Sequence, residues 1–279
     1  MRKLETIAEM KSVCRGATRE RKTLGLVPTM GALHEGHLSL VRTSRVQCEV
    51  TAVSIFVNPL QFGPSEDLGK YPRTLQRDAA RLEELGVDFL FGPPVAEMYP
   101  PGAQTHVEVS ELSGKLDGAS RPGHFRGVAT VVCKLFEIVR PHRAYFGQKD
   151  AAQVAVLRKM VRDLSIDVEM VVCPIVREAD GLAMSSRNVY LSPTERKQAL
   201  VLSRSLQQVK VAFVGGESDG QRLTDIGKQV IASEPGAQLD YFAVVNPDTL
   251  DPVGKVRPGT LVAVAAWIGT TRLIDNLLL

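Results

Sequence analysis

The sequence predicts an α/β protein built around a mostly parallel sheet. Through the first two-thirds of its 279 residues, short apolar runs alternate with helical patterns. Strands that are separated by helices of this length form βαβ units, in which the strands run parallel. The nearly unbroken apolar run at 53–57 supports this interpretation, because a strand covered on both faces carries apolar side chains throughout.

Local patterns place the elements of this first part. We expect strands at 23–27, 50–57, 87–91, 144–146 and 168–172. We expect helices between them at 37–48, 74–85, 128–139 and 151–164. Pro28 is expected to end the first strand, and Thr74, which follows Pro72, to cap the second helix. The basic stretch at 15–22 is expected to be the solvated end of a helix.

The pattern changes after Val176, where a polar loop at 177–188 begins. Beyond it, Ser192 fits an N-cap, Pro193 the first helical position and Glu195 the third residue of a capping box. We expect a long helix from this point, a shorter helix at 223–232, and strands near 239–245, 260–266 and 272–277. The change predicts one domain at 1–176 and a smaller domain at 177–279.

The composition excludes several classes of protein. Apolar residues make up 44% and charged residues 23%, as in ordinary globular proteins, and a formal net charge of +3 gives no indication of nucleic-acid binding. The longest strongly apolar stretch, 261–268, is too short for a membrane span, and residues 1–9 lack the apolar segment of a signal peptide. Cys14, Cys48, Cys133 and Cys173 are scattered, which favours free buried thiols in a reducing cytoplasm over disulfides or a zinc site.

The most informative motif runs from Pro28 to His37, between the first strand and its helix. Free N–H groups at a helix start favour an anion. His34 and His37 are three residues apart, so both can project from the first turn. Two imidazoles there suit a pentavalent phosphate, whose charge grows as a nucleophile attacks. A zinc site is a weaker alternative, because HExxH needs a spacing of four, and ordinary surface histidines are another.

A second motif, Asn58-Pro59-Leu60-Gln61-Phe62, follows the next strand. Ligands bind at the carboxyl ends of strands in open α/β sheets. The neutral amides of Asn58 and Gln61 can orient a carboxylate and hydroxyl groups without neutralising the carboxylate as a nucleophile. The alternative is a loop amide that caps backbone groups.

Two later motifs carry cationic and hydroxyl side chains. Lys149 lies beside Gly147 at a strand-to-helix turn, which fits a phosphate contact, and Gln153 lies about one helical turn further on. The loop before the second domain contains Met184-Ser185-Ser186-Arg187, whose hydroxyls and guanidinium can close on a triphosphate, although a polar linker has similar composition. No GxGxxG follows a strand, which weakens a dinucleotide oxidoreductase.

Together these motifs resemble the pantothenate synthetases, the pantoate–β-alanine ligases, within the HIGH-motif nucleotidyltransferase group. The matching stretches are PTMGALHEGH, SIFVNPLQFG with YPRT after it, HFRGVATVV, YFGQKDAAQ and GLAMSSRNVYLS. The resemblance implies a Rossmann-like N-terminal domain with the active site, a smaller C-terminal α+β lid domain, and a cytoplasmic homodimer with no nucleic-acid or membrane partner.

The resemblance also implies the reaction. ATP and (R)-pantoate would form pantoyl adenylate and pyrophosphate, and β-alanine would then attack the adenylate to give pantothenate and AMP. His34, His37 and Lys149 would be catalytic, with His37 as a proton donor, while Gln61 and Gln153, and beside them Asn58, would bind substrate. The residues expected on ATP are Met30, Gly31, Ala32, Leu33, His34, Glu35, Gly36, His37, Gly147, Gln148, Lys149, Asp150, Val176, Met184, Ser185, Ser186 and Arg187.

We further expect Mg²⁺ on the triphosphate, held largely by phosphate oxygens and water, with Asp78 and Asp150 as candidate outer ligands and no dedicated metal site. Three other functions stay open on the residues alone. A nucleotidylyltransferase would release an adenylyl product and form no amide with β-alanine. A regulatory module would bind ATP without releasing AMP, and nucleic-acid binding would show a strong salt dependence.

Overall fold

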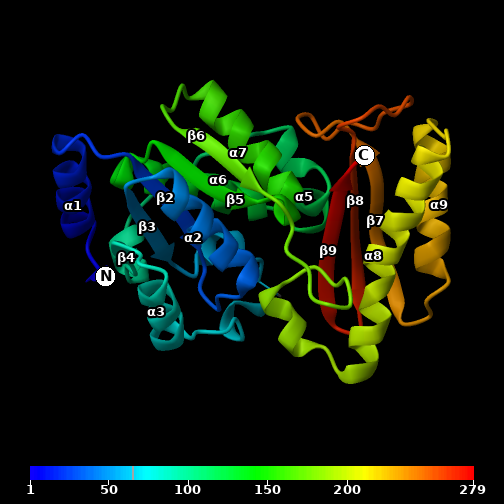
Figure 1. Cartoon of the computed structure of the whole chain (residues 1–279), viewed down its shortest axis with the longest axis horizontal. Helices are drawn as coiled ribbons and strands as arrows, with labels where there is room; N and C mark the ends of the chain where they lie inside the picture. Colours follow the sequence, from blue (N-terminus) through cyan, green and yellow to red (C-terminus); the bar gives the residue numbers. More distant parts are fainter. Residues whose placement is uncertain (65) are drawn as a thin grey trace.

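Two sheets organise the chain, which the computed structural model describes over residues 1–64 and 66–279 (Figure 1). The first sheet has six parallel strands in the order β1-β4-β3-β2-β5-β6. The second has three antiparallel strands in the order β7-β8-β9. The predicted fold class, a parallel α/β sheet followed by a smaller α+β part, is confirmed.

The first sheet and its helices occupy the chain up to Cys173. Its strands are β1 (Arg2–Leu4), β2 (Leu24–Thr29), β3 (Val50–Ile55), β4 (Phe89–Phe91), β5 (Arg143–Gly147) and β6 (Glu169–Cys173). Its helices are α1 (Ile7–Arg19), α2 (Glu35–Gln47), α3 (Leu75–Glu84), α4 (Val95–Met98), α5 (Asp117–Ser120), α6 (His124–Val139) and α7 (Ala151–Asp163). Short 3₁₀ turns are η1 (Pro59–Gln61), η2 (Asp67–Gly69), η3 (Leu112–Gly114) and η4 (Gln148–Asp150).

The remaining elements form the second sheet and its cover. They are η5 (Ser186–Tyr190), α8 (Pro193–Val214), α9 (Gly220–Ala232), β7 (Ala237–Val245), β8 (Leu261–Ile268) and β9 (Thr271–Leu278). The capping box that was predicted at the start of α8 is present, because the Ser192 hydroxyl accepts from the Glu195 N–H and the Glu195 carboxylate accepts from the Ser192 N–H.

Local differences from the expected elements have physical causes. β2 continues through Pro28, because the missing N–H of Pro28 faces β5, whose pairing with β2 ends at Leu26. Thr74 occupies the N-cap position of α3, yet its hydroxyl donates to Asp78 and makes no capping bond. β1 and α1 were not predicted as elements, although the expected helix end near residues 15–22 is confirmed by the end of α1 at Arg19.

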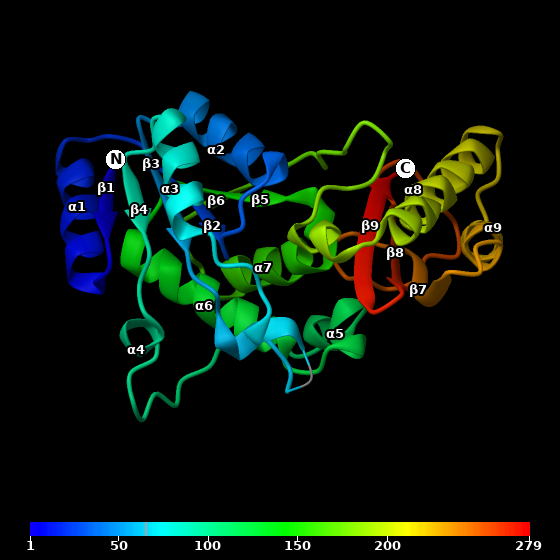
Figure 2. The ribbon, with the colours of Figure 1, turned by 90° about the horizontal axis from the view of Figure 1, so that it is seen from below.

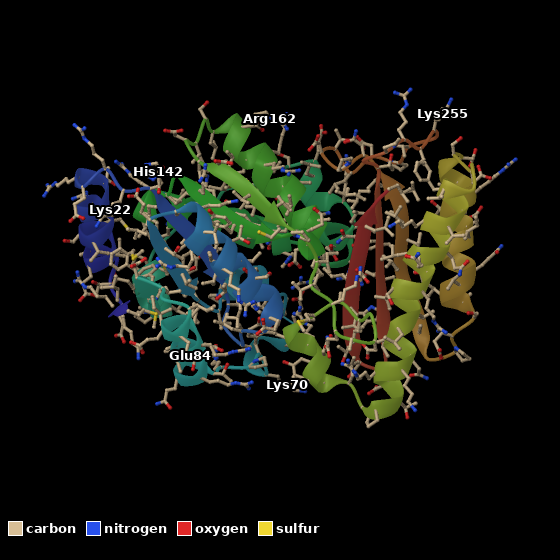
Figure 3. The ribbon with its side chains drawn as sticks, viewed as in Figure 1. Lys22, Lys70, Glu84, His142, Arg162 and Lys255 are labelled. Carbon is tan, nitrogen blue, oxygen red and sulfur yellow. The ribbon has the colours of Figure 1, made fainter. Side chains whose placement is uncertain are left out.

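Helices cover both faces of the first sheet, as Figure 2 shows, with α2 and α3 on one side and α6 and α7 on the other. Alternate residues of the central strands enter the two layers: Leu26 of β2 packs with α1, α6 and α7, whereas Val27 packs with α2 and α3. Charged side chains such as Glu84, Arg162 and Lys255 lie at the outer margin (Figure 3). No described helix has the length and apolar character to cross a membrane.

The second sheet is buried on both faces. Residues such as Val262 and Val264 pack under α8 and α9, on the side away from the first sheet (Figure 1). Val245, Leu261 and Ala263 belong instead to the core that is shared with α6 and α7. This shared core fixes the second sheet against the first. The four cysteines are free thiols, and all except Cys133 are buried, in agreement with the sequence-based expectation for the other three.

Candidate active site

A buried aspartate shapes the turn between β2 and α2. Gly31 has φ +84° and Ala32 has φ +51°, so a residue with a Cβ adopts the left-handed conformation at Ala32. Asp78 of α3 compensates this strain, because its carboxylate accepts the N–H groups of Ala32 at 2.8 Å and Leu33 at 3.0 Å. The Thr74 hydroxyl donates to the same carboxylate at 3.0 Å.

These contacts revise the expected role of Asp78. Three donors already occupy its carboxylate, and the side chain is 1% exposed. The structure therefore does not support Asp78 as an outer ligand of Mg²⁺. Asp78 instead fixes the turn at 31–33, which leads directly to His34 and His37 at the start of α2.

The two histidines cap α2 themselves. His34 is the N-cap residue, and its Nδ1 accepts the N–H of Gly36 at 3.1 Å. His37 lies at the third helical position, and its Nδ1 accepts the N–H of His34 at 3.4 Å. A hydrogen-bond acceptor on the side chain at each of these positions is the arrangement of a capping box. Since each Nδ1 accepts, each neutral ring carries its proton on Nε2.

Both rings are held in the neutral form. Burial lowers the pKa of His34 to about 4, and the charge of Lys149 acts in the same direction. Burial lowers the pKa of His37 to about 3, assisted by His34 and Lys149. At neutral pH the rings therefore offer two Nε2–H donors and no positive charge.

The strand end of β5 supplies the lysine. Lys149 lies in η4, between β5 and α7, and its Nζ is 3.9 Å from the Asp150 carboxylate. The backbone of this turn is bound from the second sheet, since Asn276 of β9 donates to the carbonyl oxygens of Gln148 at 3.0 Å and Lys149 at 2.8 Å. Gln153, one turn along α7, lies at the wall of a cavity.

The loop after β6 lies against the first sheet. The Ser186 hydroxyl donates to the Ala32 carbonyl at 3.2 Å, and the Ser185 hydroxyl accepts from the Arg187 N–H. The Arg187 guanidinium forms a bidentate pair with Asp67, at 3.1 and 3.0 Å. All three side chains therefore have protein partners in this structure. For Arg187, the present partner is a carboxylate that a phosphate would have to replace.

Gln61 and Asn58 form a buried pair. Asn58 is 1% exposed, and its amide donates to Gln61 and to the Gly127 carbonyl while its oxygen accepts from Leu60 and Tyr99. All its polar atoms are thus occupied, which suits positioning of Gln61 better than direct substrate binding. The Gln61 carboxamide in turn donates to Met30 Sδ at 2.9 Å.

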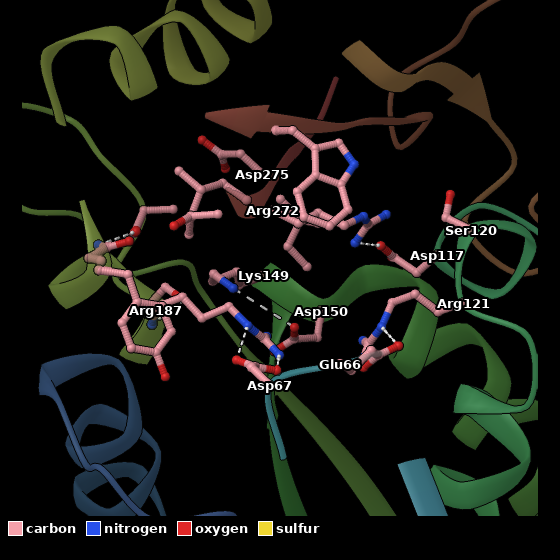
Figure 4. A pocket seen from close by; sticks show the side chains of 18 of the residues that line it. Glu66, Asp67, Asp117, Ser120, Arg121, Lys149, Asp150, Arg187, Arg272 and Asp275 are labelled. Carbon is pink, nitrogen blue, oxygen red and sulfur yellow. Dashed lines mark hydrogen bonds and ion pairs between the residues drawn. The ribbon is translucent and has the colours of Figure 1, made fainter. Parts of the chain in front are cut away.

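Two cavities are bordered by the predicted motifs, and β9 contributes to the wall of the larger one. The smaller, of about 160 Å³, is bordered by these expected ATP residues: Met30, His34, Gly36, His37, Gly147, Lys149, Asp150, Val176, Met184, Ser185, Ser186 and Arg187. The larger, of about 830 Å³, contains Gln153 in its wall and is shown in Figure 4, where the Arg187–Asp67 pair lies opposite β9. Lys149, Asp150, Ser185 and Arg187 border both.

The other expected ATP residues support the smaller cavity from outside. Gly31, Ala32 and Leu33 form the turn on Asp78. Glu35 pairs with Arg42 and Arg81, and Gln148 donates to Asn276 at 3.1 Å.

Several residues of the site were not predicted. Tyr71 borders the smaller cavity, and its YPRT stretch matches the family without a chemical pattern of its own. Arg121 borders the larger cavity, pairs with Glu66 and donates to His124 at 3.0 Å (Figure 4). Burial, followed by the Arg121 charge, lowers the pKa of His124 to about 4. The HFRG stretch gave a signal for His124, whereas Glu66 had none.

The charges around the smaller cavity indicate its ligand. Lys149 and Arg187 border it with two imidazole N–H donors, against the one carboxylate of Asp150 among the described lining residues. Such a set suits a polyphosphate at the strand ends of a parallel sheet. The fold and these charges together fit a nucleotide-dependent α/β enzyme.

Comparison with known proteins specifies the family. The family model of pantoate-beta-alanine ligase matches residues 2–278. A pantothenate synthetase from Koribacter versatilis is 62% identical over all of this chain and 96% of its own length, and one from Thermotoga neapolitana is 57% identical over the whole of both. The chain belongs to the pantoate-beta-alanine ligase family.

Solved structures agree with this assignment. A pantothenate synthetase from Thermus thermophilus has a TM-score of 0.95 at 50% identity, with 99% of each chain covered. A pantoate-beta-alanine ligase from Francisella tularensis, complexed with beta-gamma ATP and beta-alanine, has a TM-score of 0.81 at 36% identity, covering 100% of this chain and 97% of its own. The protein is thus a carbon–nitrogen ligase of pantothenate biosynthesis, and the predicted function is confirmed at this level.

Proposed function

We propose that the chain joins (R)-pantoate to β-alanine in two steps within the two adjoining cavities. The observation that carries this proposal is the convergence of three separate segments, 30–37, 147–150 and 184–187, on one small cationic cavity. In the first step, a pantoate carboxylate oxygen attacks the α-phosphorus of ATP, and the bond to the bridging oxygen breaks to release pyrophosphate. In the second, the neutral amine of β-alanine attacks the acyl carbon, AMP leaves, and the amine proton passes to solvent.

The histidines would act on the first step as hydrogen-bond donors. Their Nε2–H groups can stabilise the charge that grows on the phosphoryl oxygens during the attack. Because the pKa of His37 is lowered to about 3, we assign it a neutral donor role in place of the expected transfer of a proton. Gln61 and Gln153 would hold pantoate, with Asn58 positioning Gln61.

Lys149, Ser185, Ser186 and Arg187 would hold the triphosphate. For Arg187 this requires an exchange of partners, because its guanidinium is paired with Asp67. The Asp67 carboxylate and a phosphate group both accept two parallel hydrogen bonds from a guanidinium. The exchange therefore needs only a movement of the Arg187 side chain. Asp67 would then keep Arg187 oriented until ATP arrives.

Mg²⁺ would enter with the triphosphate. Mg²⁺ keeps several waters and usually takes one or two carboxylates with substrate phosphates. Within the described residues no group of three potential metal-ligating side chains is close enough to hold a cation by itself, and Asp150 is the carboxylate that borders the smaller cavity. This donor set fits a metal brought by ATP, with Asp150 as an outer ligand. When bound, the ion would neutralise charge on the leaving pyrophosphate.

We propose residues 1–176 as the catalytic domain and 177–279 as the lid domain of a cytoplasmic homodimer. Because the second sheet shares a core with the first, the segment that moves on closure would be the loop at 177–188 and not the whole domain. Gly181, with φ +92°, would be its turning point. Family resemblance supports the dimer, and four free thiols agree with a reducing compartment. Protection of this loop from protease by ATP and pantoate tests the lid, and sedimentation tests the dimer.

The decisive experiment is isotope exchange between pyrophosphate and ATP. Pantoate alone is expected to support exchange, because adenylation needs no amine, and β-alanine is then expected to yield pantothenate and AMP in equal amounts. Exchange that required β-alanine would contradict the stepwise adenylate. Exchange without amide product would favour a nucleotidylyltransferase, and ATP binding without either would favour a regulatory module.

A further inference from the structure

Two consecutive polar residues of β9 are buried, one on each face of the second sheet. Asp275 is 3% exposed and Asn276 is 2% exposed. Side chains of neighbouring strand residues point to opposite faces of a sheet. Asp275 is paired across the strand with Val264, on the face toward α8, whereas Asn276 is paired with Ala263, on the face toward the first sheet. Buried polar groups of this kind are retained where they have specific partners.

Asn276 uses its whole carboxamide on the turn that carries Lys149. Its Nδ2 donates to the carbonyl oxygens of Gln148 at 3.0 Å and Lys149 at 2.8 Å, and its Oδ1 accepts from the Gln148 side chain at 3.1 Å. These are the contacts between β9 and η4, two elements 128 positions apart in sequence. The backbone of the lysine turn is therefore bound by the second sheet.

Asp275 binds the loop that carries Met184 to Arg187. Its carboxylate accepts two bonds from Arg177, at 2.6 and 2.9 Å. Arg177 begins the loop, forms a bridge to Ala183, and donates to the Gly181 carbonyl at 3.1 Å. Asp275 also accepts the backbone N–H of Asn276 at 2.8 Å. The carboxylate thus joins the loop to the same strand that holds the lysine turn.

We propose that Asp275 and Asn276 are positioning residues for the triphosphate, and that they set the place of Lys149 relative to the loop at 177–187. Asp275 lies in the wall of the larger cavity, but neither side chain borders the smaller one, so both act on the phosphate site through the segments that they bind. The inference rests on the proposed function, because it takes Lys149 and Arg187 as phosphate ligands. It makes ATP use depend on a strand of the C-terminal sheet whose own residues resemble no nucleotide motif.

The substitution Asn276→Asp isolates this role. It keeps the size of the side chain and an acceptor for Gln148, but it replaces two N–H donors by an oxygen that repels the carbonyls of Gln148 and Lys149. Misplacement of a substrate-binding group by about 1 Å costs up to roughly a hundredfold in rate. We therefore expect Asn276→Asp to worsen kcat/KM for ATP by about tenfold to a hundredfold. The KM values for pantoate and β-alanine are expected to change little.

Three further variants make the result interpretable. Asn246→Asp is the matched control, because Asn246 is an exposed turn residue whose oxygen accepts two N–H groups, and the carboxylate can do the same. Asn276→Ala serves if Asn276→Asp fails to fold. Asp275→Asn removes the charge of the Arg177 pair and is expected to weaken ATP use in the same way. The measurements are KM and kcat for ATP and pantoate in pyrophosphate exchange and for β-alanine in pantothenate formation, with thermal unfolding of each variant.

A fall in kcat/KM for ATP, with unchanged KM values for pantoate and β-alanine, supports the inference. Unchanged ATP kinetics in folded Asn276→Asp, or equal losses for all three substrates that follow the loss of stability, would overturn it. The variant Lys149→Ala distinguishes failure of the positioning role from failure of the proposed function. Impaired ATP kinetics in Lys149→Ala with normal kinetics in Asn276→Asp would overturn the positioning role alone, whereas normal ATP kinetics in Lys149→Ala would overturn the proposed function as well.

Discussion

His34 and His37 are joined through the backbone of the helix that they begin, because Nδ1 of His37 accepts the N–H of His34 while Nδ1 of His34 accepts the N–H of Gly36. Their ring centroids are 4.1 Å apart. Each imidazole thus has one structural nitrogen and one nitrogen for a ligand. Removal of the whole ring would therefore mix the loss of a helix cap with the loss of a phosphate contact.

Substitutions that keep the cap separate these two effects. His34→Asn retains a side-chain acceptor at the N-cap, and His37→Gln retains one at the third helical position. In both replacements the amide oxygen makes the capping bond, which leaves no N–H at the position of the imidazole Nε2, so we expect kcat to fall by about a hundredfold to a thousandfold, with a small change in the KM for ATP. His34→Ala is expected to lose about 1 kcal/mol more unfolding free energy than His34→Asn.

Steady-state kinetics at saturating pantoate and β-alanine, with chemical denaturation of each variant, test this prediction. The double variant is expected to lose less than the sum of the single losses, because both donors serve one group of oxygens. A His37→Gln enzyme with near-normal kcat and a raised KM for ATP would show that the ring binds only the ground state.

The pH dependence distinguishes a neutral donor from an acid. Burial lowers the pKa of His34 to about 4 and of His37 to about 3, from 6.5. Neither ring then titrates between pH 6 and 8. The pH profile of kcat for exchange is therefore expected to have the same shape in the parent and in His37→Gln over this range. A limb in which kcat falls as pH rises, and which His37→Gln abolishes, would identify an imidazolium acid.

The same lowered pKa values predict how stability depends on pH. Below pH 6.5 the two histidines are protonated in the unfolded chain, whereas in the folded chain they stay neutral. Their contribution to stability is therefore fully present above pH 6.5 and is lost as the pH falls toward 4. Denaturation at pH 7.5 and pH 5 is expected to show a smaller loss of unfolding free energy in the variant with both His34→Asn and His37→Gln than in the parent.

Asp78 gives a prediction that separates turn structure from metal binding. Asp78→Asn places an amide against the N–H of Ala32 or Leu33, and an unsatisfied buried donor costs about 1–3 kcal/mol. We expect unfolding free energy to fall by that amount and kcat to fall with it, while the Mg²⁺ concentration for half-maximal activity stays unchanged. Thr74→Val, which removes one donor to the same carboxylate, is the milder control. A raised Mg²⁺ requirement in Asp78→Asn would restore the metal role.

The contrast between Ser192 and Asn276 shows what the sequence can predict. The cap at Ser192 depends on residues three positions apart, so its pattern is visible in the sequence and was predicted correctly. The strand ends near His34, Gln61 and Lys149 were also predictable, because parallel sheets gather their loops at one edge. The partners of Asn276 lie 127 and 128 positions away, and no local pattern marks them.

Asp78 shows a second limit of the sequence. The sequence analysis names Asp78 only as a candidate outer ligand of Mg²⁺. The partners of its carboxylate depend on the left-handed turn at Ala32, a conformation that sequence patterns do not predict for a non-glycine residue. The orientation of the two imidazoles is also tertiary information. Spacing placed both histidines on the first helical turn, yet only the folded chain shows which nitrogen of each faces the backbone.

The last prediction concerns Gly127, where α6 crosses the turn that carries Gln61. A Cβ at Gly127 would lie 2.2 Å from the Leu60 carbonyl oxygen and 2.6 Å from the Gln61 nitrogen. The contact is with backbone, so Gly127→Ala must displace η1 from α6. We expect unfolding free energy to fall by about 1–3 kcal/mol, even though alanine favours the helix.

Gly16 in α1 is the matched control, because nothing lies within 4 Å of a Cβ built there. Gly16→Ala is expected to stabilise the protein by about 0.5–1 kcal/mol through helix propensity alone. Since Gly127 also binds Asn58 through its carbonyl, displacement of η1 moves Gln61, and the KM for pantoate is expected to rise in Gly127→Ala but not in Gly16→Ala. Denaturation and pantoate kinetics on both variants measure this. A Gly127→Ala protein as stable as the parent, with normal KM for pantoate, would mean that α6 does not set the position of Gln61.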